Sequence, residues 1–230
     1  MKIFFGSRLF ETRGLFFDKD GTLVDLHHQY STLMDKRAEK ILIRYPQEGG
    51  FRRALCRAVG YDPESRTIAH GGPLAVATRE QTLEIVSNFL AGQGLSGEKA
   101  ERIARESFQL ADRELGWEEL IRPMEGLTAL LSSLGGLKVA EFFQLVLGGD
   151  EVSRPKPDAE MIQEACRRLG LHPREIVYVG DTVSDMIMAR RAGAGLAVAV
   201  LGGAADESIL AAEADVVISN LRAISVSGET

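Results

Sequence analysis

Short apolar segments that are bounded by glycine or aspartate restrict the fold of this chain more than any other feature. Continuous apolar runs of this length, bounded by turn-forming residues, are typical of buried strands in a parallel sheet. The segments are residues 14–17 (GLFF) before Asp18, 145–147 (LVL) before Gly148, 176–179 (IVYV) before Gly180, 196–200 (LAVAV) near Gly202, and 215–218 (DVVI).

Helical patterns occupy intervals between these segments. Residues 158–169 place apolar side chains on one stripe, with Pro157 before them and Gly170 after them, and these are typical helix boundaries. A second helix is predicted over 184–192, where Gly193 ends it. Because strands and helices alternate, the sequence predicts an α/β fold with a doubly wound parallel-sheet core.

The middle of the chain has a different pattern. From about residue 27 to residue 120 it shows helical periodicity and no convincing strand. Thr78 and Gln81 form a capping-box sequence that predicts the start of one of these helices. We therefore expect two domains, a core made of residues 1–26 and 121–230 and an all-helical domain of residues 27–120 inserted into it.

Composition excludes several classes of protein. The 33 acidic residues outnumber the 27 basic ones, which gives a net charge of −6, whereas nucleic-acid-binding proteins usually carry a basic face. The longest apolar runs, such as 196–201, are far shorter than the roughly 20 residues that span a bilayer. Cys56 and Cys166 have no metal-ligand spacing, so we expect two reduced thiols in a cytoplasmic protein.

Carboxylates follow the first predicted strand. Asp18 and Asp20 are two residues apart and therefore point to the same side of an extended chain. Two carboxylates held close together repel each other unless a cation or a proton intervenes, and this favours a hard divalent ion such as Mg²⁺. Gly21 permits a sharp turn, and the amides of Gly21 and Thr22 are candidates for holding an anion.

Two further sites follow later in the chain. Lys156 lies between Pro155 and Pro157 just before a predicted helix, and the prolines stiffen its loop. Asp181 comes at the end of the 176–179 strand, where we expect a metal ligand. Asp185 lies on the first turn of the next helix, where the helix dipole alone also favours an acidic residue.

Taken together, D-x-D-G-T, the proline-flanked lysine and G-D-x-x-x-D resemble the motifs of the haloacid dehalogenase superfamily, in particular its phosphoglycolate-phosphatase-type hydrolases. The resemblance covers nearly the whole chain. It implies a Rossmannoid core with a helical cap inserted after the first motif, with hinges at Val24-Asp25 and Pro123–Gly126.

The resemblance also implies a role for each matching residue. Asp18 is the expected nucleophile, which forms an aspartyl-phosphate, and Asp20 is the expected general acid and base. Lys156 is expected to hold Asp18 and the phosphoryl group. Mg²⁺ is expected to bind Asp18, the Asp20 carbonyl and Asp181, with Asp185 in support.

The implied activity is Mg²⁺-dependent hydrolysis of a small phosphorylated metabolite by a monomer or homodimer that binds neither nucleic acid nor membrane. Two alternatives stay open. One is a degenerate member of the superfamily that binds a ligand without turnover, and the other is a sugar-phosphate mutase. His27, His28 and Arg79 in the helical domain are candidates for contact with the substrate.

The chain departs from the superfamily pattern in one segment. Members have a further strand before the lysine loop that ends in Thr or Ser, followed by a helix. Here Leu137–Ala140 resembles the start of that strand, but the roughly 10–12 residues that a parallel crossover needs are missing. Ser132 and Ser133 are the nearest hydroxyls. We expect an exposed strand edge beside Asp18, which the N-terminal run 2–5 (KIFF) partly covers.

Overall fold

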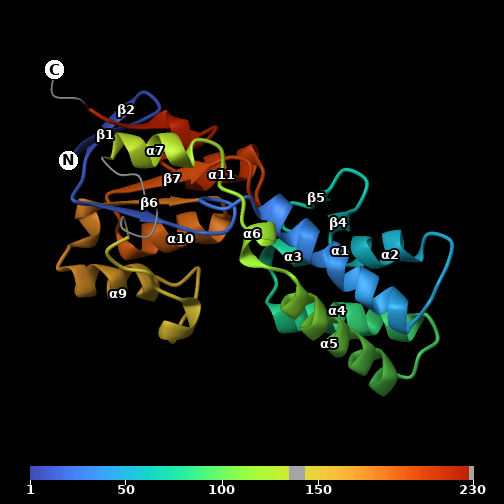
Figure 1. The fold of residues 1–230 in the computed structure, drawn as a ribbon. Coiled ribbons are helices and arrows are strands. Elements are labelled where there is room, and N and C mark those ends of the chain that lie inside the picture. The colour runs from blue at the N-terminus through green and yellow to red at the C-terminus, as the bar shows by residue number, and fades with distance from the viewer. Residues whose placement is uncertain (135–142, 228–230) are drawn as a thin grey trace. The chain divides into compact units, whose positions relative to one another are not determined.

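The chain forms two compact units. The computed structural model describes residues 1–134 and 143–227 (Figure 1). The core unit comprises Met1–Val24 and Pro123–Thr230, and the helical unit comprises Asp25–Arg122. Across the two described ranges, no helix is long and apolar enough to cross a membrane.

The core unit is built on a parallel sheet of four strands in the order β3-β6-β7-β8. Their bounds are Gly14–Phe17, Ile176–Gly180, Leu196–Val200 and Val216–Ile218. Helices α9, α10 and α11 follow or precede these strands, with bounds Glu160–Leu169, Val183–Ala192 and Glu207–Glu213. Short 3₁₀ turns occupy Gly149–Glu151, Pro173–Glu175 and Leu221–Ala223.

Alternate side chains of β6 and β7 enter two different hydrophobic clusters. Ile176 and Tyr178 pack with residues of α9, α10 and α11 on one face of the sheet. Val177 and Val179 pack on the opposite face, against α7 (Leu127–Ser133) and the N-terminal strands. Both faces of the sheet are therefore covered, as Figure 1 shows, and the predicted doubly wound α/β core is confirmed.

A second sheet of three antiparallel strands belongs to the core unit. It has the order β2-β1-β9, with bounds Arg8–Glu11, Lys2–Phe5 and Ile224–Val226. The expectation that the N-terminal run covers the edge beside Asp18 is therefore wrong, because β1 forms its ladder with β2 and β9. Ile3 and Phe5 are fully buried instead, against one face of the parallel sheet.

The strand predicted over 145–147 is also wrong. These residues have no regular structure, and Val146 is 77% exposed. A three-residue apolar run forms a strand only beside a partner, and the segment before it is too short for a parallel crossover. Within the described ranges, β3 accordingly lies at the edge of its sheet. The predicted strand start Leu137–Ala140 lies outside the described residues.

The helical unit contains six helices among its residues 25–122. They are α1 (Leu26–Arg44), α2 (Phe51–Ala58), α3 (Pro73–Val76), α4 (Arg79–Gly92), α5 (Gly97–Glu114) and α6 (Trp117–Leu120). The Thr78–Gln81 capping box at the start of α4 is confirmed.

The helical unit is not entirely helical. A small antiparallel hairpin pairs β4 (Tyr61–Asp62) with β5 (Thr67–Ile68), which corrects the prediction that this region has no strand. Two-residue strands are too short to produce an alternating pattern in the sequence. Their position is instead fixed by tertiary packing, because Tyr61 is 1% exposed and Ile68 is 3% exposed.

Candidate active site

Asp18 and Asp181 lie together because two parallel strands end together. Phe17 of β3 is paired with Val179 of β6, and the Asp18 amide donates a hydrogen bond to the Val179 carbonyl at 2.9 Å. The carboxyl ends of parallel strands form a common edge, where ligands of open α/β sheets bind.

The loop before α9 carries Lys156 to the same edge. Glu160, the first residue of α9, accepts hydrogen bonds from the amides of Ser153 (2.8 Å) and Arg154 (3.1 Å) and so fastens the loop to the helix. Lys156 Nζ lies 2.5 Å from Oδ1 of Asp18 and 2.6 Å from Oδ1 of Asp185. One ammonium group thus bridges two carboxylates.

Asp185 is held by donors on both of its oxygens. Tyr178 donates its hydroxyl to Oδ1 at 3.1 Å. Thr182 donates its hydroxyl to Oδ2 at 2.6 Å and its amide to the same oxygen at 3.1 Å. The Asp185 side chain is 1% exposed. Thr182 also caps α10, since its hydroxyl accepts from the Asp185 amide.

Asp181 has a different environment, because it is buried and no basic side chain within residues 1–134 and 143–227 pairs with it. Its Oδ2 accepts a hydrogen bond from the Ala204 amide at 2.7 Å, and its Oδ1 accepts from the buried Thr22 hydroxyl at 3.3 Å. Gly21, with φ of 85°, and Gly203 both approach this carboxylate so closely that a Cβ at either position would overlap it. Any side chain at position 21 or 203 would therefore displace the Asp181 carboxylate.

Burial and charge shift the ionisation of these groups. Desolvation raises the pKa of Asp181 to about 7, and repulsion by Asp185 adds to the effect. Desolvation and repulsion by Asp185 also raise the pKa of Asp18, and Lys156 offsets them only in part. Burial alone would lower the pKa of Lys156, but attraction to Asp185 and Asp18 outweighs it and the pKa lies above its usual range. Negative charge is therefore in excess at this edge.

These side chains fit a divalent cation. Asp18, Asp181 and Asp185 each offer an oxygen, and the three oxygens lie within 4.8 Å of one another. Carboxylate oxygens are the ligands that Mg²⁺ prefers. Among the described residues no basic side chain forms an ion pair with Asp181, whose pKa is raised by burial and by repulsion from Asp185, and a cation at the cluster would offset that repulsion.

Asp20 does not join the group of three carboxylates. Its Oδ1 lies 2.7 Å from Lys19 Nζ without forming a hydrogen bond, and its side chain is 29% exposed. The turn that carries it is tight, since the amides of Leu23 and Val24 both donate to the Lys19 carbonyl at 2.9 Å. The Gly21 amide donates to the Val24 carbonyl at 2.8 Å and is therefore already engaged within the turn.

The serines considered as substitute hydroxyls are engaged elsewhere. Ser132 donates its hydroxyl to the Thr128 carbonyl at 2.9 Å, and Ser133 donates to the Leu130 carbonyl at 2.8 Å. Both partners belong to the same helix, α7. In the part of the chain that the structure describes, the hydroxyls that contact the carboxylate cluster are those of Thr22, Tyr178 and Thr182.

The candidate substrate contacts of the helical unit all have partners inside that unit. The amide of Ile68 donates to Nδ1 of His27 at 3.0 Å, and Nε2 of His28 lies 2.9 Å from the Glu119 carbonyl. Arg79 forms a two-point ion pair with Asp112 at 3.0 and 2.9 Å. These contacts give His27, His28 and Arg79 a role in stabilising the helical unit.

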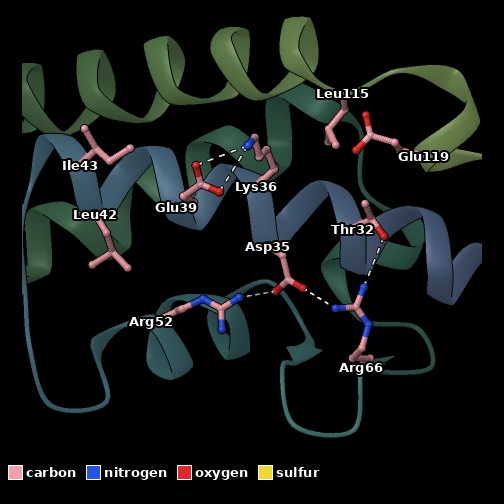
Figure 2. Close-up of a pocket in the computed structure, with 10 residues that line it drawn as sticks. All are labelled: Thr32, Asp35, Lys36, Glu39, Leu42, Ile43, Arg52, Arg66, Leu115 and Glu119. Atoms are coloured by element: carbon pink, nitrogen blue, oxygen red, sulfur yellow. Dashed lines mark hydrogen bonds and ion pairs between the residues drawn. The ribbon is translucent and has the colours of Figure 1, made fainter.

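A cavity of about 640 Å³ lies beside α1 in the helical unit, as Figure 2 shows. Asp35 accepts from Arg52 at 2.8 Å and from Arg66 at 2.7 Å, and Lys36 pairs with Glu39 at 3.4 Å. The positive side chains that line this cavity are thus each matched to an acidic neighbour.

Four contributors to the carboxylate cluster were not predicted. The phenol of Tyr178 points to one face of β6, which is known only once the sheet is placed. Gly203 and Ala204 come from the loop after β7 and meet Asp181 only in the folded chain. Thr182 could have been identified from the sequence, because T-V-S-D is a capping-box sequence like the one that predicts the start of α4.

Comparison with known proteins agrees with this geometry. Residues 127–199 match the profile of the haloacid dehalogenase-like hydrolases. Over 213 residues the chain is 28% identical to a phosphoglycolate phosphatase of Photorhabdus laumondii. The alignment covers 90% of this chain and 88% of that protein.

Two solved structures share the fold. The structure of a predicted phosphoglycolate phosphatase from Haemophilus somnus superposes with a TM-score of 0.64 at 17% identity, over 92% of this chain and 95% of the other. A structure from Thermotoga maritima, provisionally assigned as a β-phosphoglucomutase, superposes with a TM-score of 0.61 at 18% identity, over 91% and 95% of the two chains. Motifs, sheet topology and sequence similarity thus agree on a likeness to the haloacid dehalogenase-like hydrolases, whose profile matches residues 127–199.

Proposed function

We propose that this protein is a Mg²⁺-dependent phosphatase that hydrolyses a small phosphomonoester through an aspartyl-phosphate on Asp18. The observation that carries the proposal is the bridge from Lys156 to Asp18 and Asp185, next to the buried Asp181 carboxylate. A carboxylate attacks a phosphate dianion only where positive charge offsets their repulsion. Lys156 supplies such a charge within contact of the proposed nucleophile.

In the first proposed step an oxygen of Asp18 attacks phosphorus, and the bond from phosphorus to the leaving oxygen breaks. Asp20, in its protonated form, gives its proton to that oxygen, and the alcohol departs. In the second step Asp20, now ionised, takes a proton from water while the water oxygen attacks the phosphorus. Asp18 is released as a carboxylate, and inorganic phosphate leaves.

Asp18, the Asp20 carbonyl and Asp181 are the proposed ligands of Mg²⁺, with Asp185 beside them. When bound, Mg²⁺ supplies positive charge that neutralises the phosphoryl oxygens and the crowded carboxylates. Lys156 orients Asp18 and contributes further positive charge toward the transferring group. We propose that the core unit carries this chemistry and that the helical unit serves as the cap domain.

A phosphate-release screen tests the function. Purified protein is incubated with a panel of phosphorylated metabolites, including phosphoglycolate, with Mg²⁺ and with chelator. The matched control is Asp18→Asn, which preserves the shape of the side chain. We expect Mg²⁺-dependent phosphate release from one or a few small phosphomonoesters by the parent and none by the variant. Conversion of a sugar phosphate into its isomer without phosphate release would favour a mutase, and no reaction across the panel would favour a ligand-binding protein.

A further inference from the structure

The number of donors around Asp185 separates it from the other two carboxylates of the cluster. Its Oδ1 contacts Lys156 and Tyr178, and its Oδ2 accepts twice from Thr182. A carboxylate offers about four lone-pair sites, so these four contacts fill it. A metal ion bound directly to Asp185 would have to displace one of them from a side chain that is 1% exposed.

Asp181 has fewer hydrogen-bond and ion-pair partners than Asp185. It accepts from Ala204 at 2.7 Å and from Thr22 at a longer 3.3 Å, and no ion pair to it occurs among the described residues. Its remaining lone pairs and its charge lie at the same edge of the sheet as Asp18. The two buried acids of the G-D-x-x-x-D motif therefore differ in how many lone pairs remain available to a metal ion.

Tyr178 connects the interior of the sheet to Lys156. The side chain is 5% exposed in the middle of β6, which is paired on both sides, so the ring has little freedom to move. Its hydroxyl donates to the same oxygen of Asp185 that Lys156 contacts. The Lys156 ammonium also lies 5.8 Å from the centre of the Tyr178 ring, within the range of a cation–π contact.

We propose that Tyr178 is a positioning residue that holds Lys156 against Asp18 through Asp185, and that Asp185 does not ligate the metal directly. The inference rests on the proposed function for its catalytic consequence. Tyr178 and Thr182 fix the carboxylate, the carboxylate fixes the ammonium, and the ammonium faces the nucleophile. Asp18 and Asp181 are left as the carboxylate ligands of the metal.

The first test uses Tyr178→Phe, which removes one hydroxyl and keeps the ring. Tyr61→Phe is the matched control, because Tyr61 is also buried and also donates to an aspartate, Asp35, at 3.0 Å, but in the helical unit. Loss of a buried hydrogen bond to a charged group predicts a fall in kcat of about tenfold for Tyr178→Phe. We expect little change in KM and no fall in kcat for Tyr61→Phe.

A double-mutant cycle separates positioning from general destabilisation. If Tyr178 acts through Lys156, Tyr178→Phe has no further effect on kcat once Lys156 has been replaced by alanine. An equal fall in the parent and in the Lys156→Ala background would overturn the proposal.

A second measurement tests the position of Lys156 without turnover. An amine-reactive reagent acetylates Lys156, and peptide mass spectrometry measures the rate of acetylation in the parent and in each tyrosine variant. We expect faster acetylation in Tyr178→Phe and an unchanged rate in Tyr61→Phe, and equal rates in the parent and Tyr178→Phe contradict the proposal.

The second test concerns the metal alone. The Mg²⁺ dissociation constant is measured, without substrate, from the rise of the thermal midpoint with Mg²⁺ concentration. Asp181→Asn, which removes a proposed ligand oxygen, is expected to weaken binding several-fold more than Asp185→Asn, which removes only a nearby charge. Equal weakening in the two variants would make Asp185 a direct ligand and overturn the assignment. Because this measurement needs no turnover, a failure of the proposed phosphatase activity remains distinguishable from a failure of this inference.

Discussion

The ammonium nitrogen of Lys156 lies 2.5 Å from Oδ1 of Asp18, although 138 residues separate them in the chain. The contact depends on β3 and β6 ending together and on Glu160 fastening the lysine loop to α9. The contact between Lys156 and Asp18 therefore forms only when the core unit is folded. The expected consequences of breaking this contact differ according to which partner is changed.

Asp18→Asn is expected to abolish turnover and to leave the fold intact. The amide has the shape of the carboxylate but is a far weaker nucleophile, and Lys156 keeps its second partner, Asp185, at 2.6 Å. Turnover is measured by phosphate release, and the fold by circular dichroism and the thermal midpoint. Asp150→Asn, at an exposed position of the core unit, is the control and should retain activity. Hydrolysis at nearly the parent rate would show that Asp18 is not the nucleophile.

Lys156→Ala is expected to lower kcat far more than it raises KM. The ammonium is held in place before substrate arrives, so its contribution grows with the charge that develops during transfer. Loss of one such donor predicts a fall in kcat of about 10²–10³-fold. Steady-state kinetics provide the measurement, and Lys99→Ala, at an exposed site of α5, is the control. A change confined to KM would assign Lys156 to substrate binding alone.

The parallel sheet could be predicted from sequence because its strands leave a strong local signal. The run 14–17 and the runs that begin at residues 176 and 196 are continuous and apolar, and glycine or aspartate follows each of them. The three residues 145–147 share that composition, but a strand also needs a neighbour to pair with. Pairing is a tertiary property, and the short preceding segment supplies no crossover, so the same local pattern gave a wrong prediction there.

The carboxylate cluster was predictable only where its residues follow a strand directly. Asp18 and Asp181 follow β3 and β6, and parallel strands bring their carboxyl ends together. The Ala204 amide and the Tyr178 hydroxyl reach these carboxylates through the packing of β7 and through the choice of sheet face. Neither is visible in a local pattern. Sequence therefore indicates the charged residues of the site, whereas the groups that orient them require the folded chain.

Removal of metal is expected to stop phosphate release. With Asp18, Asp181 and Asp185 offering oxygens within 4.8 Å of one another, the site without a cation repels the phosphoryl group that it must bind. Activity is measured in chelator and again after Mg²⁺ is restored in excess, and recovery in the second measurement controls for denaturation. Full activity in chelator, or activity restored by zinc and not by Mg²⁺, would contradict the assignment of magnesium.

The stability of the metal-free protein is expected to fall as pH rises toward neutrality, because of Asp181. The pKa of this carboxyl is raised to about 7 in the folded chain, against about 3.9 in the unfolded chain. Between these values the folded state binds more protons than the unfolded state, so its stability decreases as pH increases. The difference of roughly three pKa units corresponds to a loss on the order of 4 kcal/mol between about pH 4 and pH 7.

Asp181→Asn removes this titration. In chelator the variant is expected to gain stability relative to the parent as pH rises and to be more stable at about pH 8, where the parent must bury an unpaired charge. Denaturant unfolding at a series of pH values, with Asp150→Asn as the control, measures the difference. Excess Mg²⁺ should reverse the order at about pH 8, because the parent carboxylate gains a cation and the asparagine binds it less well. If the free energy of unfolding of Asp181→Asn and of the parent changed in parallel across this pH range, burial would not raise the pKa of Asp181. The electrostatic argument for a cation at the site would then be wrong.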